Sequence, residues 1–283
     1  MICYVILHYQ DLDMTRRCIN SLLKNKQESK LIVVDNCSPN GSGLILEEEF
    51  SNEDRITVIR NNQNQGFACG NNIGFYFAKK KFSPDIIVVI NNDIIIDDLA
   101  FENKIEECFK NKEVDILGPD IITPLGNHQN PLAYHPLSSK YIKRRIKIDK
   151  MKIRLFKWNI FFKIYIFYKK KNPAPVRKET PKQVNDCILH GSCMIYGKRY
   201  IEKENFAFVP VTYMYNEEAI LYDYLKFKGY KTMYLPSVSV LHMQGVSTSK
   251  RMVDQKERIC FRFEKQTESA TKQLLEREKY SGC

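Results

Sequence analysis

The 283-residue sequence predicts an α/β fold, a Rossmann-like, mixed and mostly parallel sheet flanked by helices, with a basic helical insert and a C-terminal helical tail. Two observations predict the sheet: short β-branched runs alternate with segments of helical periodicity, and polar residues follow the runs at their ends. Such alternation favours parallel strands joined by crossover helices on both faces. A composition of 43% hydrophobic and 27% charged residues is typical of a globular protein.

The first 90 residues supply most of the predicted elements. We expect strands at 3–7, 31–34, 56–60 and 86–90, and helices at 12–24 and 72–81. Ligands of such sheets bind beyond the carboxyl ends of the strands, so the polar residues there should converge on one crevice. These residues are His8 and Tyr9, Asp35 and Asn36, Asn61 to Asn64, and Asn91 to Asp93.

The triplet Asn91-Asn92-Asp93 separates two apolar runs, Ile86 to Ile90 and Ile94 to Ile96. An unpaired polar group in a dry core costs roughly 1 to 3 kcal/mol, so we expect the triplet at an edge where a ligand binds. Because no G-x-G-x-x-G follows the first strand and no G-x-x-x-x-G-K-[ST] occurs, dinucleotide and P-loop cradles are unsupported. A strand-end carboxylate such as Asp93 can instead hold Mg²⁺ or Mn²⁺ together with diphosphate oxygens and water.

Residues 140–182 make the protein basic. They hold 16 Lys and Arg against Asp149 and Glu179, a charge of +14, whereas the rest of the chain carries −3 of the net +11. The segment predicts one amphipathic helix or two, suited to an anionic membrane surface, where each cation contributes about 1 kcal/mol. The alternative is a helix that covers the sheet with its charges solvated. The apolar stripe is Ile142, Ile146, Ile153, Phe156, Ile160, Ile164 and Phe167.

Cysteine usage and the N-terminal segment predict a cytoplasmic protein. The nine cysteines are odd in number, scattered and without a C-x-x-C pair, which argues against a zinc ribbon or a secreted disulfide framework. The start, MICYVILHYQD, predicts a first strand rather than a signal peptide. No apolar run approaches the ~18 residues of a membrane span. We therefore expect a cytoplasmic protein, peripheral on the inner face of the cell membrane.

Several stretches resemble a known family. VVDNCSPNGS, NQGFACGNNIGF and VVINNDIIID resemble the nucleotide-sugar half of inverting glycosyltransferase family 2, which has the GT-A fold. The third is similar to the variant of the family's D-x-D motif found in rhamnosyltransferase-like members, with only the last aspartate kept. HGSCMIYGKRYIEKENFAF and YMYNEEAILYDYLKFKGYKTMYLPSVSVLH resemble the acceptor half. In that half, Ile220 and Tyr224 replace an acid and an arginine common in the family.

The resemblance implies a division of the chain and a reaction. Residues 1–125 would bind the nucleotide sugar, 126–183 form the basic insert, 184–245 bind the acceptor and carry catalysis, and 246–283 form the helical tail. The implied reaction moves a sugar, with inversion, from a UDP- or dTDP-linked donor to a hydroxyl of a glycan acceptor. A lipid-linked acceptor in the synthesis of a surface polysaccharide such as a capsule is expected.

The resemblance, together with the strand ends, also implies roles for individual residues. Counting back from Gly229 places Glu217 and Glu218 on the family's acidic pair, with Glu217 as catalytic base and Glu218 with Gly191 on the acceptor side. Asp93 and His242 are the expected ligands of Mn²⁺ or Mg²⁺. The expected donor-binding residues are Leu7, Tyr9, Asp35, Asn36, Gly66, Asn72, Asn91, Asn92 and Asp93.

Other roles remain open at this level. Asp35 could form an Asx turn with the following Ser38, and Asn71 and Asn72 could cap the next helix. Tyr9 could be an ordinary packing residue, and His242 a satisfied interior histidine. Glu217 and Glu218 could be first-turn acids favoured by the helix dipole. Two other functions concern the whole chain. A sugar nucleotidyltransferase is disfavoured because the sequence lacks the glycine- and arginine-rich N-terminal loop expected of that class. Nucleic-acid binding would not explain the polar residues at the strand ends. We therefore expect no nucleic acid partner.

Overall fold

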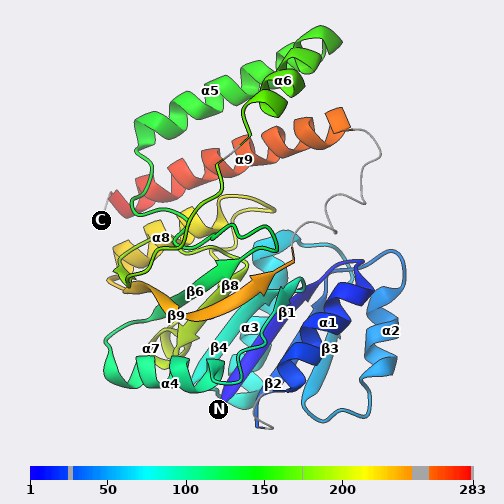
Figure 1. The fold of residues 1–283 in the computed structure, drawn as a ribbon, viewed down its shortest axis with the longest axis vertical. Coiled ribbons are helices and arrows are strands. Elements are labelled where there is room, and N and C mark those ends of the chain that lie inside the picture. Colours follow the sequence, from blue (N-terminus) through cyan, green and yellow to red (C-terminus); the bar gives the residue numbers. More distant parts are fainter. Residues whose placement is uncertain (25–27, 174, 244–254, 282–283) are drawn as a thin grey trace.

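The computed structural model describes residues 1–24, 28–173, 175–243 and 255–281, and these form one large sheet with helices around it (Figure 1). The strands are β1 (Ile2–His8), β2 (Lys30–Asp35), β3 (Ile56–Arg60), β4 (Ile86–Asn91), β5 (Ile94–Ile95), β6 (Ile116–Ile122), β7 (Val184–Asn185), β8 (Cys193–Gly197) and β9 (Thr232–His242). The helices are α1 (Leu12–Leu23), α2 (Ser42–Glu49), α3 (Gly66–Phe82), α4 (Phe101–Asn111), α5 (Ser139–Phe156), α6 (Asn159–Lys171), α7 (Lys198–Lys203), α8 (Glu217–Lys228) and α9 (Gln255–Ser281).

The sheet is mixed and mostly parallel, as predicted. In the described residues its order is β3-β2-β1-β4-β8-β6-β9-β5, with β7 paired to β9. Strands β1 to β4 run parallel, and β8 lies antiparallel between β4 and β6. The parallel pair β6 and β9 then carries β5 and β7 as antiparallel partners. Strands from residues 1–125 and from residues 184–245 therefore share one sheet and one core.

Two apolar layers hold the helices on the sheet. Successive side chains of β1 point to opposite faces, so Ile6 packs beneath α1 and α4 while Val5 packs beneath α3. On the first face the core includes Ile19 and Phe101, and on the second it includes Phe75. Burying each such side chain contributes roughly 1.5 to 3 kcal/mol. These layers fix the strand ends from which the site is built.

The start of α3 differs from the prediction. The helix begins at Gly66, six residues before the predicted start at Asn72. Asn64 supplies the reason, because its Oδ1 accepts a hydrogen bond from Gly66 N at 2.9 Å and so satisfies one of the unpaired donors of the first turn. The pair Asn71 and Asn72 consequently lies inside the helix rather than at its cap.

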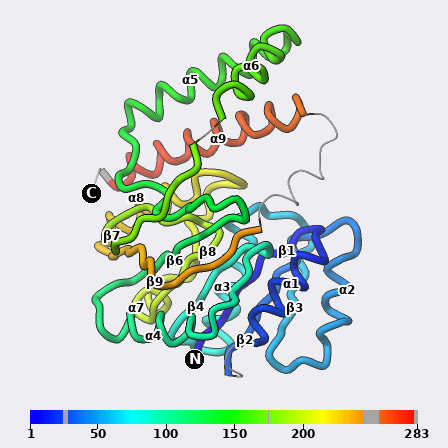
Figure 2. Tube along the Cα trace, in the orientation of Figure 1, coloured from blue at the N-terminus to red at the C-terminus, as the bar shows by residue number. Residues whose placement is uncertain are grey.

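The basic insert and the last helix form a separate layer beyond α8 (Figure 2). We call α5, α6 and α9 the helical layer. The insert forms two helices, and α5 packs along α9, which in turn packs on α8. The predicted apolar stripe divides, because Ile142 and Phe156 of α5 are buried whereas Ile160, Ile164 and Phe167 of α6 are exposed. Helix α5 thus packs on α9 and α6 packs on α5, whereas residues 128–130 at the start of the insert bond to β6.

Residues 246–254 of the predicted tail lie outside the described residues, and 255–281 form α9. In the ranges that the structure describes, no helix combines the length and the apolar character needed to cross a bilayer.

Candidate active site

A cavity of about 140 Å³ opens at the carboxyl ends of β1 and β4. It brings together most of the residues predicted to bind the donor, adds Asn64 from the polar residues expected after the third strand, and adds three whose roles the sequence did not indicate. The predicted residues that line it are Leu7, Tyr9, Asn36, Gly66, Asn91, Asn92 and Asp93, and the additional ones are Asn64, Phe67, Tyr213 and Met214. Below we call it the donor pocket.

Two predicted donor residues do not line the pocket. Asn72 is fully engaged elsewhere, since its Nδ2 donates to Phe208 O at 2.7 Å and its Oδ1 accepts from the N–H groups of Ala207 and Phe208. It holds the 207–208 loop against α3. Asp35 is buried and accepts from Ser38 N at 3.1 Å, which is the Asx turn foreseen as its alternative role.

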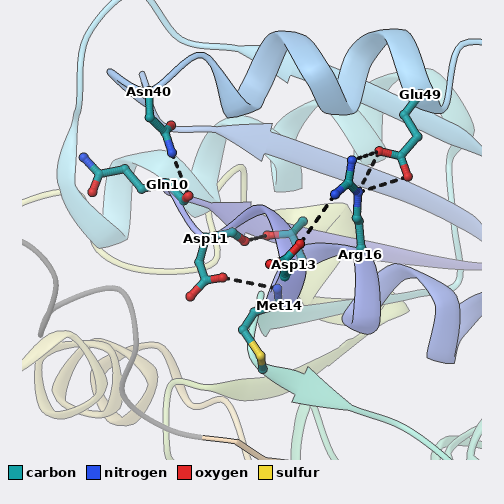
Figure 3. Close-up of polar contacts among 8 residues, drawn as sticks. Gln10, Asp11, Asp13, Met14, Arg16, Asn40 and Glu49 are labelled. Carbon is teal, nitrogen blue, oxygen red and sulfur yellow. Dashed lines mark hydrogen bonds and ion pairs between the residues drawn. The ribbon is translucent and has the colours of Figure 1, made fainter.

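The loop after β1 places Tyr9 at the rim of the pocket. Gln10 has a positive φ of 64°, and its carbonyl oxygen accepts from Asn40 Nδ2 at 2.9 Å (Figure 3). The next residue, Asp11, caps α1 by accepting from Met14 N at 3.3 Å. These contacts fix the backbone on the C-terminal side of Tyr9, so that an aromatic ring is held where a nucleobase could stack.

Asn36 and Gly66 join the donor wall to the segment before α8. Asn36 Nδ2 donates to Asn64 Oδ1 and to Gly66 O, and Asn36 Oδ1 accepts from Gln65 N. Gly66 has φ +79°, and a Cβ there would lie 2.2 Å from Tyr213 O, so only glycine fits. Tyr213 in turn donates its hydroxyl to Asn64 Oδ1 at 3.1 Å. The wall is thus a hydrogen-bonded unit.

Helix α9 contacts the same wall from the other side. Ser269 Oγ donates to Met214 O at 2.8 Å, and the Lys265 ammonium lies 5.4 Å from the centre of the Tyr213 ring. The helical layer therefore reaches the donor pocket through α9.

Asp93 and His242 fit a divalent cation. His242 Nδ1 lies 2.6 Å from Gln129 Oε1, and an amide oxygen can only accept, so Nδ1 carries a proton and Nε2 is the nitrogen left to bind a cation. That Nε2 lies 3.2 Å from Asp93 Oδ1, a buried oxygen with no hydrogen-bond donor among the described residues. Two lone-pair donors facing one another match adjacent ligands of an octahedral ion, and Gln129 is the outer-shell partner that a ligating histidine needs.

The protein alone offers this ion an incomplete set of ligands. No three His, Cys, Asp or Glu side chains gather into a metal site within the described ranges. The remaining positions would fall to donor diphosphate oxygens and water, as is usual for Mg²⁺.

The acidic pair opens α8 from a constrained backbone. Tyr215 and Asn216 both have positive φ, 74° and 66°, an arrangement that costs roughly 1 to 3 kcal/mol per residue and is concentrated at functional sites. Glu217 is buried, and its Oε1 accepts from Thr212 Oγ1 at 3.0 Å. Burial, reinforced by the neighbouring Glu218, raises the pKa of Glu217 to about 8.

Glu218 has a different environment. It is half-buried, and its Oε1 accepts from Gly191 N at 3.1 Å. A Cβ at Gly191 would lie 2.8 Å from that oxygen, so glycine permits the close approach. The next residue, Ser192, accepts from Asn91 N at 2.9 Å through its carbonyl oxygen. Backbone hydrogen bonding therefore connects the loop that holds Glu218 to the triplet that contains Asp93.

Residues 3–171 match the domain described as Glycosyl transferase family 2. This chain belongs to glycosyl transferase family 2.

Crystal structures of Staphylococcus aureus TarS have a similar fold. TarS 1–349 with UDP-GlcNAc superimposes with a TM-score of 0.55 at 14% identity, covering 89% of this chain and 61% of that one. The UDP complex gives 0.54 at 13%, with 93% and 70% covered, and TarS 1–349 alone gives 0.53 at 12%, with 86% and 60% covered. The family 2 chain thus spans about 60% of the length of that last structure. At identities this low, the structural similarity establishes the fold alone. A sequence search of curated proteins found no match.

Sequence reasoning missed a further residue of this family 2 site. His190 lies beside His242, with ring centroids 6.0 Å apart, and accepts at Nδ1 from Ser192 N at 3.2 Å. Burial lowers the pKa of His190 to about 4, so the ring is neutral. The feature that could have indicated it is its position in the stretch HGSCM, directly before Gly191.

The raised pKa of Glu217 predicts a pH-dependent stability. Below about pH 8 the folded protein keeps this carboxyl protonated, whereas the unfolded chain releases the proton above pH 4.5. The folded state therefore binds the extra proton between these values, and stability falls as pH rises, by up to about 1.4 kcal/mol per pH unit. Glu217→Gln should remove this loss, so its melting temperature should gain on the wild type from pH 5 to pH 8.

Thermal melts at several pH values test this expectation. Glu48→Gln, which changes an exposed carboxylate on α2, is the matched control and should give a constant difference. A constant difference for Glu217→Gln as well would show that folding does not raise its pKa.

Proposed function

We propose that this protein is an inverting glycosyltransferase that moves a sugar from a UDP- or dTDP-linked donor to a hydroxyl group of a glycan acceptor. The observation that carries the proposal is the convergence, at one sheet edge of a family 2 chain, of a cation-fitting pair and an acidic pair. The family match does not support the alternatives of a sugar nucleotidyltransferase or a nucleic-acid-binding protein.

Asp93 and His242 would hold Mn²⁺ or Mg²⁺, which when bound supplies positive charge that stabilises the departing nucleoside diphosphate. Tyr9, Phe67 and Tyr213 give the pocket aromatic surface for the nucleobase. Asp35 would contact the nucleoside as well, because a carboxylate that accepts from Ser38 N keeps further oxygen lone pairs that can accept from a ligand. Together these residues would orient the donor sugar for in-line attack by the acceptor hydroxyl.

We assign the role of base to Glu218, although the resemblance pointed to Glu217. A base must meet the acceptor hydroxyl in its ionised form. Glu217 is 4% exposed, and a pKa of about 8 keeps it mostly protonated at neutral pH. Burial also raises the pKa of Glu218, but hydrogen bonds from the backbone N–H groups of Glu218 and Gly191 lower it. With Glu217 protonated, the neighbouring carboxyl carries no charge that opposes the ionisation of Glu218.

We further propose that the acceptor is lipid-linked and that the protein works on the inner face of the cell membrane, in synthesis of a surface polysaccharide such as a capsule. The support is the +14 charge of residues 140–182 and the exposed apolar side chains of α6. Placement in the rhamnosyltransferase-like branch rests on Asp93 being the only carboxylate of the triplet.

Thermal-shift measurement with nucleotides tests the donor assignment. We expect UDP or dTDP, and neither GDP nor CMP, to raise the melting temperature, with a larger rise in Mn²⁺. At a hundredfold excess over Kd the stabilisation is about 2.7 kcal/mol, or several degrees for a chain of this size. Absence of a shift with all four nucleotides, with or without Mn²⁺, would remove the proposal.

A further inference from the structure

Helix α6 carries more apolar surface than the protein buries. Phe162 and Tyr165 face inward, with ring centroids 5.4 and 5.1 Å from that of Phe156, and Tyr165 also meets Phe263 of α9. A second set of apolar side chains points outward and is 42–69% exposed: Trp158, Ile160, Phe161, Ile164, Phe167 and Tyr168. A helix that is apolar on opposite sides is normally covered on both, so the outward face needs an apolar medium.

A basic groove of about 640 Å³ lies between α5, α6 and α9. Its only acidic lining residue, Asp149, is buried and neutralised, with Lys152 Nζ at 3.0 Å and Arg145 Nε at 3.6 Å. The other cations that line it, Arg144, Lys169 and Arg262, have no ion-pair partner among the described residues. Three cations from three helices around one groove can bind a phosphate group, and guanidinium groups do so bidentately.

The groove and the outward face of α6 adjoin one another. Lys169 of the groove directly follows the exposed Phe167 and Tyr168 on the same helix turn. Apolar and aromatic side chains next to cations match the boundary between lipid headgroups and acyl chains. A nucleic acid backbone would use the cations but would leave Ile160 and Ile164 without a partner.

We propose that the groove between α5, α6 and α9 binds the phosphate of an anionic lipid headgroup while the outward side chains of α6 enter the membrane interface. This inference deepens the membrane attachment of the proposed function and rests on it. It names a defined headgroup site, which diffuse attraction between a basic surface and an anionic bilayer does not require.

The single tryptophan of the chain reports membrane entry directly. Trp158 stands at the start of α6 and is 69% exposed. With phosphatidylglycerol-containing vesicles its emission should shift to shorter wavelength and be quenched by brominated acyl chains. Phosphatidylcholine vesicles should give a much smaller change. An unshifted emission in the presence of bound anionic vesicles would overturn the apolar part of the inference.

Two variants of equal charge test the groove. Arg144→Gln, Lys169→Gln and Arg262→Gln together remove three groove cations, whereas Lys143→Gln, Lys147→Gln and Lys150→Gln together remove three exposed cations of α5 outside it. In flotation assays the groove variant should bind anionic vesicles about tenfold or more weakly than the control variant. Equal losses would mean diffuse electrostatics and no headgroup site. Unchanged melting temperatures would show that both variants fold.

Further measurements distinguish the possible sources of the phosphate group. They also show whether a failed groove test would affect the proposed transferase function. Inorganic phosphate at fixed ionic strength should compete only weakly; full release by phosphate would indicate a site for a soluble anion. Duplex DNA that binds as strongly as the vesicles, without a Trp158 shift, would favour a nucleic acid partner. The UDP or dTDP thermal shift should persist in both variants, so a failed groove test with an intact nucleotide shift leaves the transferase function standing.

Discussion

Asp93→Asn is expected to abolish metal-dependent donor binding and to lower turnover by about 10³-fold, since Lewis-acid stabilisation is worth several kcal/mol. The side chain keeps its size, but it loses the charge that faces His242 Nε2 at 3.2 Å. Calorimetric titration of the nucleoside diphosphate with and without Mn²⁺ should show that the variant no longer distinguishes the two conditions.

Asn91→Ala is the matched control for this experiment. Asn91 lines the same pocket, and the hydrogen bond from its backbone N–H to Ser192 O survives the substitution. We expect a smaller loss with the metal requirement retained. If Asp93→Asn turned over normally and still required the metal, Asp93 would not be its ligand.

Glu218→Gln is expected to lower turnover about 10²-fold to 10⁴-fold, the usual contribution of a general base. The amide keeps an oxygen that can accept from Gly191 N, but it cannot take the acceptor proton. Donor affinity should barely change, because Glu218 does not line the donor pocket. The measurement is nucleoside diphosphate release with and without acceptor, alongside calorimetric donor affinity.

Glu217→Gln is its paired control, because glutamine resembles the protonated carboxyl that burial favours at this position. We expect it to keep a measurable rate. An inactive Glu217→Gln with an active Glu218→Gln would return the base to the residue that the sequence predicted. Activity in both variants would place the base outside this pair.

The sequence predicted the sheet, and most of the proposed donor-side residues line one cavity, because the ends of strands depend on local pattern. β-branched runs followed by polar residues indicated where strands end, and seven of the nine donor-side residues line the pocket. The position of Asn72 away from the pocket could not be predicted, because its neighbours in sequence suit either a cap or a helix interior and only the distant loop at 207–208 decides between them. The orientation of His242 toward Asp93 likewise depends on Gln129 from another part of the chain, which sequence spacing does not reveal.

The sequence also could not decide between the neighbouring residues Glu217 and Glu218. Successive side chains on a helix point about 100° apart, so counting from Gly229 located the acidic pair but not which carboxyl faces outward. The helical period of the insert likewise did not indicate what would cover it: the stripe of α5 is buried or half-buried and packs on α9, whereas that of α6 is exposed. A helical period indicates that a face is covered, and tertiary structure determines what covers it.

Helix α9 contacts both the basic groove and the wall of the donor pocket. Over about two turns it presents Arg262 to the basic groove and Lys265 and Ser269 to the segment that walls the donor pocket. Any displacement of this helix on one side must alter the contacts on the other. By thermodynamic reciprocity, the factor by which anionic vesicles change nucleotide affinity equals the factor by which nucleotide changes vesicle affinity. Occupancy of the membrane and loading with donor would then form one linked equilibrium.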